Sequence, residues 1–267
     1  MADLNLNLDN ISFEKPIFLS LDTKLDKHPI TLKGHLGPIG RNPGQENIDL
    51  DLSLEAVKQV EVKIKGSLTA PLQTPGFDLN ISVSPFSPIK LANSLNQPLP
   101  FTPGDSSVLK KLGLSLTAKG NSKTLSLSSG KMVLDDSTLN FSAQAKDFHL
   151  PDLKFKIKLD RINLDSYLAI SDPAQTGEQK EMAATASAGS KAKKVQKAKK
   201  SSDYSALKKL ILDGNIEIGK IKAKGVSLEN IDAHILAKNG VIKIAPLKLD
   251  LYEGILSTKA RDRKSVV

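Results

Sequence analysis

Apolar and polar residues alternate position by position over most of this chain, and this period of two constrains its fold more than any other feature. The alternating segments are 4–8, 48–54, 60–64, 77–83, 112–116, 125–127, 139–145, 153–159, 231–237 and 247–251. A period of two is typical of β-strands that bury one face and expose the other. Turn-forming sequences such as Pro75-Gly76 and Asn239-Gly240 separate the segments, so we expect about fourteen strands, with consecutive strands antiparallel.

Helices should be few and short. Capping residues and apolar spacing predict them only at 88–96, 105–112, 164–170 and 205–212. Helices of this length offer little area with which to cover the apolar faces of so many strands.

Two mainly β architectures would bury these faces. In a closed β-sandwich or barrel, one sheet covers another. In the alternative, a long antiparallel meander forms a curved sheet whose apolar concave face stays open as a groove, and an apolar ligand such as acyl chains fills it. Aromatic residues make up only 4% of the chain, and this favours the groove, because large aromatic side chains usually help to fill a sandwich core. Both architectures fit every strand.

The segment 171–203 loses the alternation and consists mainly of Ala, Ser, Gln and Lys. Its seven Lys and four acidic residues give it +3 of the chain's net charge of +9. We interpret it as a disordered low-complexity linker that is either a solvated spacer or a contact for anionic lipid headgroups. The linker would separate a β-sheet segment with short helices, residues 1–170, from a second β segment, residues 204–261.

Composition excludes several classes of protein. The lack of Cys among 267 residues excludes disulfide scaffolds, thiolate metal sites and Cys nucleophiles. The longest uninterrupted apolar run, Tyr167–Ile170, is far shorter than the roughly 18 residues that cross a bilayer. Residues 1–6 already alternate like a strand and lack the basic and apolar regions of a secretory signal, so we interpret them as the beginning of a fragment.

No catalytic or metal-binding constellation is recognisable in the sequence. The four histidines are scattered singly, without metal-ligand spacing, and are interpreted as surface strand residues. They are His28, His35, His149 and His234. No Gly-x-Ser-x-Gly elbow of a hydrolase occurs. We therefore expect a protein that is not an enzyme and that uses neither a metal nor a cofactor.

Two further patterns resemble sites only superficially. Gly34, Gly37 and Gly40 are not followed by the Gly-Lys-Ser/Thr of a phosphate loop, and we interpret them as a turn. Adjacent Asp135 and Asp136 are interpreted as a hairpin turn rather than an acid–base pair. The sequence pI of about 9.4 raises the question of nucleic-acid binding. Arg is rare, however, and aromatic residues do not alternate with basic ones, so we expect no nucleic-acid partner.

Several short blocks stand in a characteristic order and spacing. They are Phe86–Pro100, Leu134–Leu139, Leu150–Phe155, Leu159–Leu168, Leu212–Gly219, Asn239-Gly240, Ala245–Leu247 and Leu251–Gly254. In this pattern the chain resembles the AsmA family of Gram-negative envelope proteins over roughly residues 60–260, with the low-complexity insert between the same blocks. The chain would be a latter-middle part of a family member, without its N-terminal anchor and its C-terminal remainder.

The resemblance implies a protein on the periplasmic side of the cell inner membrane, held there by an N-terminal helix that this sequence lacks. It also implies an elongated β-sheet groove of the bridge-like lipid-transfer type, with phospholipid as ligand and a role in outer-membrane biogenesis and homeostasis. The family offers no catalytic residues.

In such a groove, apolar faces of two segments would line the path of the acyl chains. The expected lining residues are Leu153, Phe155, Ile157, Leu159, Leu247, Leu249 and Leu251. Lys154, Lys156 and Lys158 of the same segment would face solvent.

Two other functions fit the pattern. One is a structural or regulatory factor that binds envelope proteins during outer-membrane protein assembly or protein targeting to the membrane. The other is a ligand-free, adhesin-like sandwich.

The last six residues, 262–267, break the strand pattern. They resemble the translation of a common sequencing adapter, and the alternative is an ordinary basic tail. We therefore expect that the native coding sequence continues beyond Arg261. A longer genomic read through this point tests the expectation, and a native stop directly after Val267 would contradict it.

Overall fold

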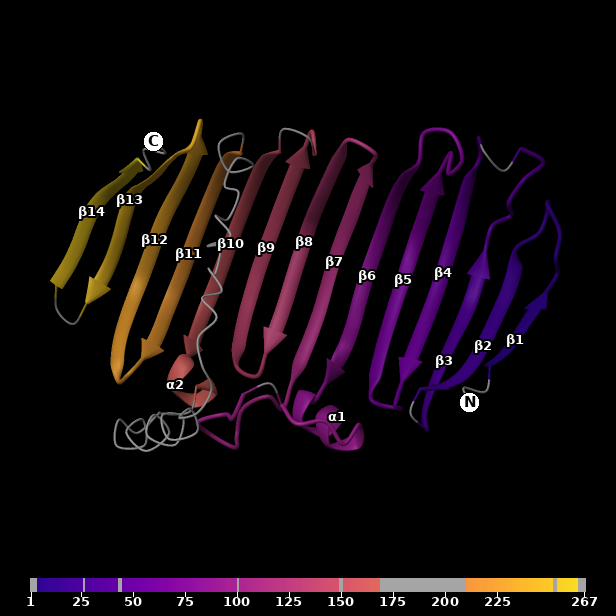
Figure 1. The fold of residues 1–267 in the computed structure, drawn as a ribbon, viewed down its shortest axis with the longest axis horizontal. Coiled ribbons are helices and arrows are strands. Elements are labelled where there is room, and N and C mark those ends of the chain that lie inside the picture. The colour runs from indigo at the N-terminus through magenta and orange to yellow at the C-terminus, as the bar shows by residue number, and fades with distance from the viewer. Residues whose placement is uncertain are drawn as a thin grey trace, which may run out of the picture.

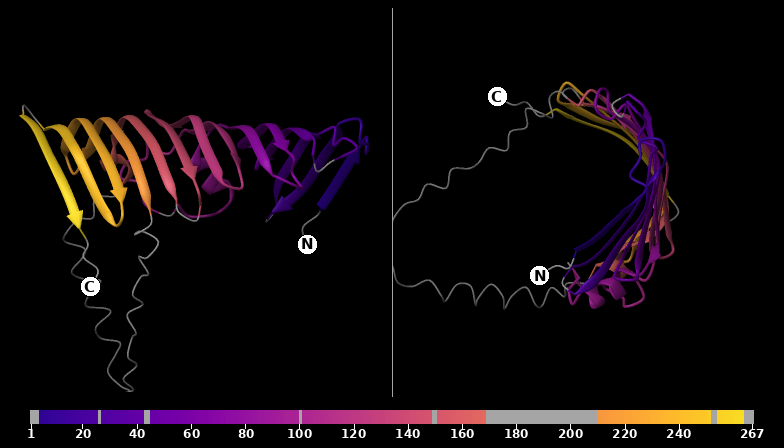
Figure 2. Two further views of the ribbon diagram at one scale, coloured as in Figure 1. Left: turned by 90° about the horizontal axis from the view of Figure 1, so that it is seen from above. Right: turned by 90° about the vertical axis from the view of Figure 1, so that its right-hand side faces the viewer.

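The computed structural model of the chain describes residues 4–25, 27–42, 45–99, 101–148, 151–168, 210–251 and 254–263. In this part of the chain the strands form one sheet of fourteen strands, whose spatial order is their order in the sequence. The sheet is open, and its strands bend into an arc (Figures 1 and 2). The expected curved meander is confirmed, and the closed β-sandwich is wrong.

The strands average about ten residues, and each strand that an alternating segment predicted is longer than that segment. Their bounds are β1 Leu4–Asp9, β2 Ile17–Leu25, β3 His28–Leu36, β4 Asn47–Ala56, β5 Val60–Thr69, β6 Gly76–Phe86, β7 Leu112–Asn121, β8 Thr124–Leu134, β9 Ser137–Lys146, β10 Asp152–Asn163, β11 Ile211–Ala223, β12 Val226–Lys238, β13 Val241–Leu251 and β14 Gly254–Arg263. The last strand therefore includes Asp262 and Arg263, two residues beyond the predicted end of the strand pattern.

Every neighbouring pair of strands is antiparallel except one. The exception is β10–β11, which is parallel, so the prediction that all consecutive strands are antiparallel is wrong there. A parallel pair requires a crossover of a dozen residues or more, and the connection 164–210 between β10 and β11 is the longest in the sheet. The connection 87–111 between β6 and β7 also exceeds this length, yet it joins an antiparallel pair. The predicted linker 171–203 belongs to the connection between β10 and β11 and lies outside the described residues.

The structure has two short helices in the described part of the chain, α1 Pro88–Ser94 and α2 Leu164–Tyr167. Both were expected, although each ends a few residues early. Ser87 caps α1, because its Oγ accepts a hydrogen bond from Lys90 N, and Pro88 occupies the first turn. Both helices lie at the same rim of the sheet (Figure 1).

The predicted helix at 105–112 is wrong. Asp105 Oδ1 does accept from Ser107 N at 2.7 Å, as a capping residue would. The N–H groups of Leu109, Lys110 and Lys111 are then bound by the side chain of Asp135 instead of by carbonyls of the preceding turn. Leu109 also adopts a φ of +58°. Most of the fourth predicted helix, 205–212, lies outside the described residues, and its last two residues begin β11.

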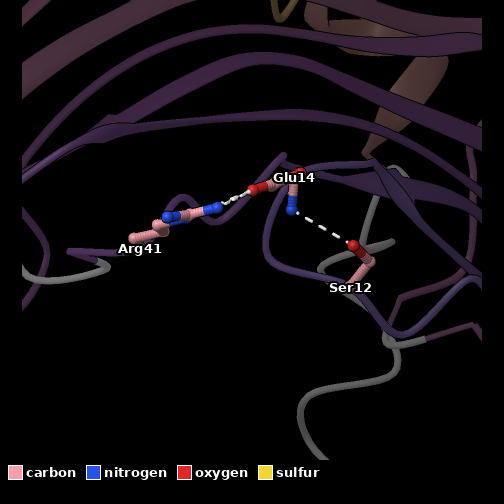
Figure 3. A network of polar contacts seen from close by, with 3 residues as sticks. All are labelled: Ser12, Glu14 and Arg41. Carbon is pink, nitrogen blue, oxygen red and sulfur yellow. Dashed lines mark hydrogen bonds and ion pairs between the residues drawn. The ribbon is translucent and has the colours of Figure 1, made fainter.

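At the opposite rim, the connections β1–β2 and β3–β4 are joined by polar contacts (Figure 3). Arg41 Nη2 lies 2.5 Å from Glu14 Oε1, and Glu14 N donates to Ser12 Oγ at 3.2 Å. A backbone hydrogen bond from Gly40 N to Phe13 O, at 2.7 Å, joins the same connections. The ion pair is exposed and adds little stability by itself, but together these contacts fix the first two loops of this rim relative to each other.

Candidate functional site

The apolar residues of neighbouring strands stand opposite one another across almost the whole sheet. In the first half, Leu21 pairs with Leu32, which pairs with Leu54 on its other side. The pattern crosses the parallel joint without interruption, since Leu153 pairs with Leu212 and Ile157 with Ile216. The strands therefore share one continuous apolar face.

This apolar face is the concave one. Ile211 N donates to Pro151 O at 3.0 Å, so the backbone groups of Pro151, Leu153, Phe155 and Ile157 point towards β11. Figure 1 shows β10 running downwards with β11 on its left, and Figure 2 shows that the hollow side faces the viewer of Figure 1. In a chain of L-residues this arrangement directs the side chains of those residues towards the viewer. Leu153, Phe155 and Ile157 therefore point into the hollow side.

Within the described residues, neither a helix nor a second sheet lies over the concave face (Figure 2). Four of its side chains are nevertheless only 6–8% exposed, namely those of Leu50, Ala118, Ala233 and Ala237. Side chains on the inside of a curved sheet converge and shield each other from solvent. Most of the remaining apolar side chains of this face are half-buried, which leaves a broad apolar groove open on one side.

Three phenylalanine rings lie across glycines of the adjacent strand and smooth the floor of this groove. The position of a Cβ on Gly214 would be 2.1 Å from Phe155 Cζ. Phe141 covers Gly130 in the same way, with a corresponding distance of 2.6 Å. The third pair is Phe77 and Gly120. A side chain on any of these glycines would displace the ring. Each large phenylalanine ring is therefore paired with a glycine on the adjacent strand, which has no side chain.

Of the predicted lining residues, Leu153, Phe155, Ile157 and Leu159 lie side by side on the concave face of β10. The backbone of β13 brings Leu247 opposite Ala233 and Leu251 opposite Leu228. Ala233 and Leu228 both lie on β12 and pair on its other side with Ile216 and Ile221 of β11. The side chains of Leu247, Leu249 and Leu251 lie outside the described residues. The structure thus places the two predicted segments on one sheet, three strands apart.

The convex face is polar. Lys154, Lys156 and Lys158 are exposed there, as expected, and Lys158 Nζ lies 3.0 Å from Glu217 Oε2 of β11. Similar cross-strand ion pairs join Asp78 to Lys119. An open hollow of about 660 Å³ also lies on this face, among side chains that include Lys156 and Glu217. Its lining mixes charged, amide and hydroxyl side chains with apolar ones, and so it differs from the continuous apolar face of the concave side.

A polar cluster at the helical rim centres on Asp135, which the sequence predicted only as a turn residue. The turn is confirmed, but the carboxylate also accepts hydrogen bonds from Leu109 N at 2.7 Å, Lys110 N at 2.8 Å, Lys111 N at 3.0 Å and Tyr167 Oη at 2.9 Å. Partial burial raises the pKa of Asp135, but these hydrogen bonds outweigh it and leave the pKa below its usual value. Partial burial, together with the hydrogen bond to Asp135, raises the pKa of Tyr167.

The remaining candidates from the sequence form no shared site. His28 and His35 lie on β3, and His234 Nε2 of β12 is 2.7 Å from Asp213 Oδ1. His149 lies outside the described residues. In the part of the chain that is described, no three His, Asp or Glu side chains are grouped as metal ligands would be. Gly34 lies within β3 rather than in a turn, so that part of its interpretation is wrong.

The described helices are also too short to span a membrane. The family comparison then decides the relationship of the chain, because a family model, AsmA family, matches residues 13–262. The chain belongs to the AsmA family. This confirms the resemblance found in the sequence blocks, and it makes the chain a membrane-associated envelope protein of that family. Comparison with curated proteins and with solved structures finds no match.

Proposed function

We propose that this AsmA-family chain shields phospholipid acyl chains in its concave groove and so takes part in phospholipid transport between the inner and outer membranes. It would act on the periplasmic side of the inner membrane and contribute to outer-membrane homeostasis. The observation that supports this function is the continuous apolar face on the hollow side of the sheet, which no described element covers.

The proposed binding is energetically favourable and also reversible. Removing one CH₂ group from water contributes about 0.8 kcal/mol, and an acyl chain in the groove would replace part of the contact between the floor and water. The headgroup would remain in water at the open side, where it needs no partner in the groove. The binding requires no covalent chemistry.

The test is native mass spectrometry with lipid extraction, on protein expressed in a lipid-containing host and purified under mild conditions. We expect phospholipid to accompany the wild-type chain. The double substitution Leu153→Asp/Ile157→Asp places two carboxylates on the groove floor, where burying a charge against an acyl chain is costly. We expect it to abolish the bound lipid.

The matched control is Asn140→Asp/Ser142→Asp on β9, which adds the same two charges to the convex face. These positions stand opposite Lys158 and Lys156, so the new carboxylates face cations and solvent. Lipid content should stay at the wild-type level, with both variants folded by circular dichroism. A folded wild-type chain that carries no lipid, or equal loss of lipid in both variants, would contradict the proposal.

A further inference from the structure

The parallel joint between β10 and β11 divides the sheet into two blocks, residues 4–168 and 210–263. The connection between β10 and β11, residues 164–210, is the longest between neighbouring strands, and the next longest, 87–111 between β6 and β7, joins an antiparallel pair. The pairing of β10 with β11 nevertheless runs the length of the strands, from Asp152 opposite Ile211 to Asn163 opposite Lys222. The Phe155 ring of one block lies across Gly214 of the other. The two blocks thus meet over a complete strand-to-strand interface.

Helix α2 extends this interface beyond the strands. It follows β10 directly and lies at the rim where β11 turns into β12 (Figure 1). Asp165 Oδ1 accepts a hydrogen bond from Lys224 N, and Asp165 Oδ2 accepts one from Gly225 N at 2.9 Å. Lys224 and Gly225 have positive φ, +50° and +76°, as in the two-residue turns that close hairpins. The backbone hydrogen bonds between the two strands of a hairpin leave the two central N–H groups of such a turn without an acceptor. Here the carboxylate of Asp165 binds both.

Helix α2 is itself fixed to the N-terminal block. Ser166 O accepts from Asp105 N at 2.9 Å, and Tyr167 Oη donates to Asp135 Oδ2. Gly104 packs so closely beneath the helix that a Cβ there would lie 2.4 Å from Asp165 O. The helix therefore connects the loop before β7 and the β8–β9 turn, both in one block, with a turn of the other block.

From this arrangement we infer that the two blocks associate without the help of their covalent connection, and that α2 is the latch of the association. Asp165 is the residue that holds the C-terminal block, through the two N–H groups of the Lys224–Gly225 turn. The inference concerns how the sheet is kept continuous and does not depend on the ligand of the groove.

The test uses the full chain with a protease recognition site inserted between Gly189 and Ser190. After complete cleavage, checked on a denaturing gel, we expect size-exclusion chromatography and native mass spectrometry to find one complex of both blocks at micromolar concentration. Asp165→Asn replaces one accepting oxygen with an N–H donor. We expect it to weaken the association of the cleaved blocks by about tenfold or more, because charged acceptors make the stronger hydrogen bonds.

Asp160→Asn is the matched control. Asp160 Oδ1 also accepts from two backbone N–H groups, those of Thr138 and Arg161, but both belong to the N-terminal block. It should leave the association constant unchanged. Separation of the cleaved wild-type blocks would overturn the inference, and so would an equal effect of the two substitutions.

Hydrogen exchange on the uncut wild-type chain tests the latch without any substitution. The Asn239–Gly240 turn has the same signs of φ, but among the described residues no side chain accepts from its central N–H groups. The amides of Lys224 and Gly225 should exchange more slowly than those of Asn239 and Gly240. Equal exchange at the two turns would contradict the role of Asp165.

Discussion

Replacing Gly66 with Ala should destabilise this sheet more than most other single-methyl substitutions in its strands. Gly66 has a φ of +151°, and a Cβ there would lie 2.0 Å from Asp78 O on the next strand. A side chain in this backbone region is strained, and the strands β5 and β6 would have to move apart to admit it. We expect a loss of about 3 kcal/mol or more in the free energy of unfolding, measured by urea denaturation followed by circular dichroism.

The control is Gly76→Ala, on the same pair of strands. Gly76 stands opposite Thr69, its φ is not positive, and the nearest atom to its Cβ position is Gly120 O at 3.4 Å. This substitution should change the stability by less than about 1 kcal/mol. Equal urea midpoints for the two variants would show that β5 and β6 do not approach each other as closely as described.

Removing the charge of Asp135 should loosen the helical rim. In Asp135→Asn, an N–H₂ group would replace one of two oxygens that together accept from four donors, and Leu109 N belongs to a residue only 9% exposed. A buried donor without an acceptor is costly, so we expect a loss of about 2–3 kcal/mol at neutral pH. Asp136→Asn, at the exposed neighbour, should cost less than about 0.5 kcal/mol. The urea midpoints of the three proteins give the comparison.

The same substitution should reduce the sensitivity of the protein to acid. The pKa of Asp135 is lower in the folded chain than its usual value. Its contribution is therefore present above the unfolded-state pKa of about 3.9 and is lost as the pH falls through the folded-state pKa. The difference in urea midpoint between wild type and Asp135→Asn should shrink from pH 7 to pH 3. A difference that does not change with pH would mean that the charge of the Asp135 carboxylate does not stabilise the helical rim.

Much of the sheet could be predicted from the sequence, because alternation is a local property. The period of two placed Leu153, Phe155 and Ile157 on one face and Lys154 and Lys156 on the other, and the structure confirms both placements. What alternation could not decide is whether a second sheet covers the apolar face, since the same pattern fits a sandwich. The choice between a closed sandwich and an open curved sheet depends on how strongly the strands bend.

The errors have a common physical origin in contacts between residues far apart in the sequence. The segment 105–112 carries a capping Asp105 and apolar spacing, yet the carboxylate of Asp135, from another hairpin, takes the N–H groups that would have continued a helix. The parallel joint likewise depends on which strand β11 meets after a long connection. The latch residue Asp165 could have been noticed only as an acidic residue in the first turn of a short helix.

Because each strand pairs only with its neighbours in the sequence, the sheet can grow during folding by adding one hairpin arm at a time. Most such steps close a loop of ten residues or fewer and cost little chain entropy, the exception within a block being β6–β7, which residues 87–111 join. The step from β10 to β11 is different, since Asp152 must find Ile211 across a much longer stretch of chain. We therefore expect the pairing of β10 with β11 to be the slowest step in the refolding of the whole chain, and the pairing of β6 with β7 to be the slowest step within the N-terminal block.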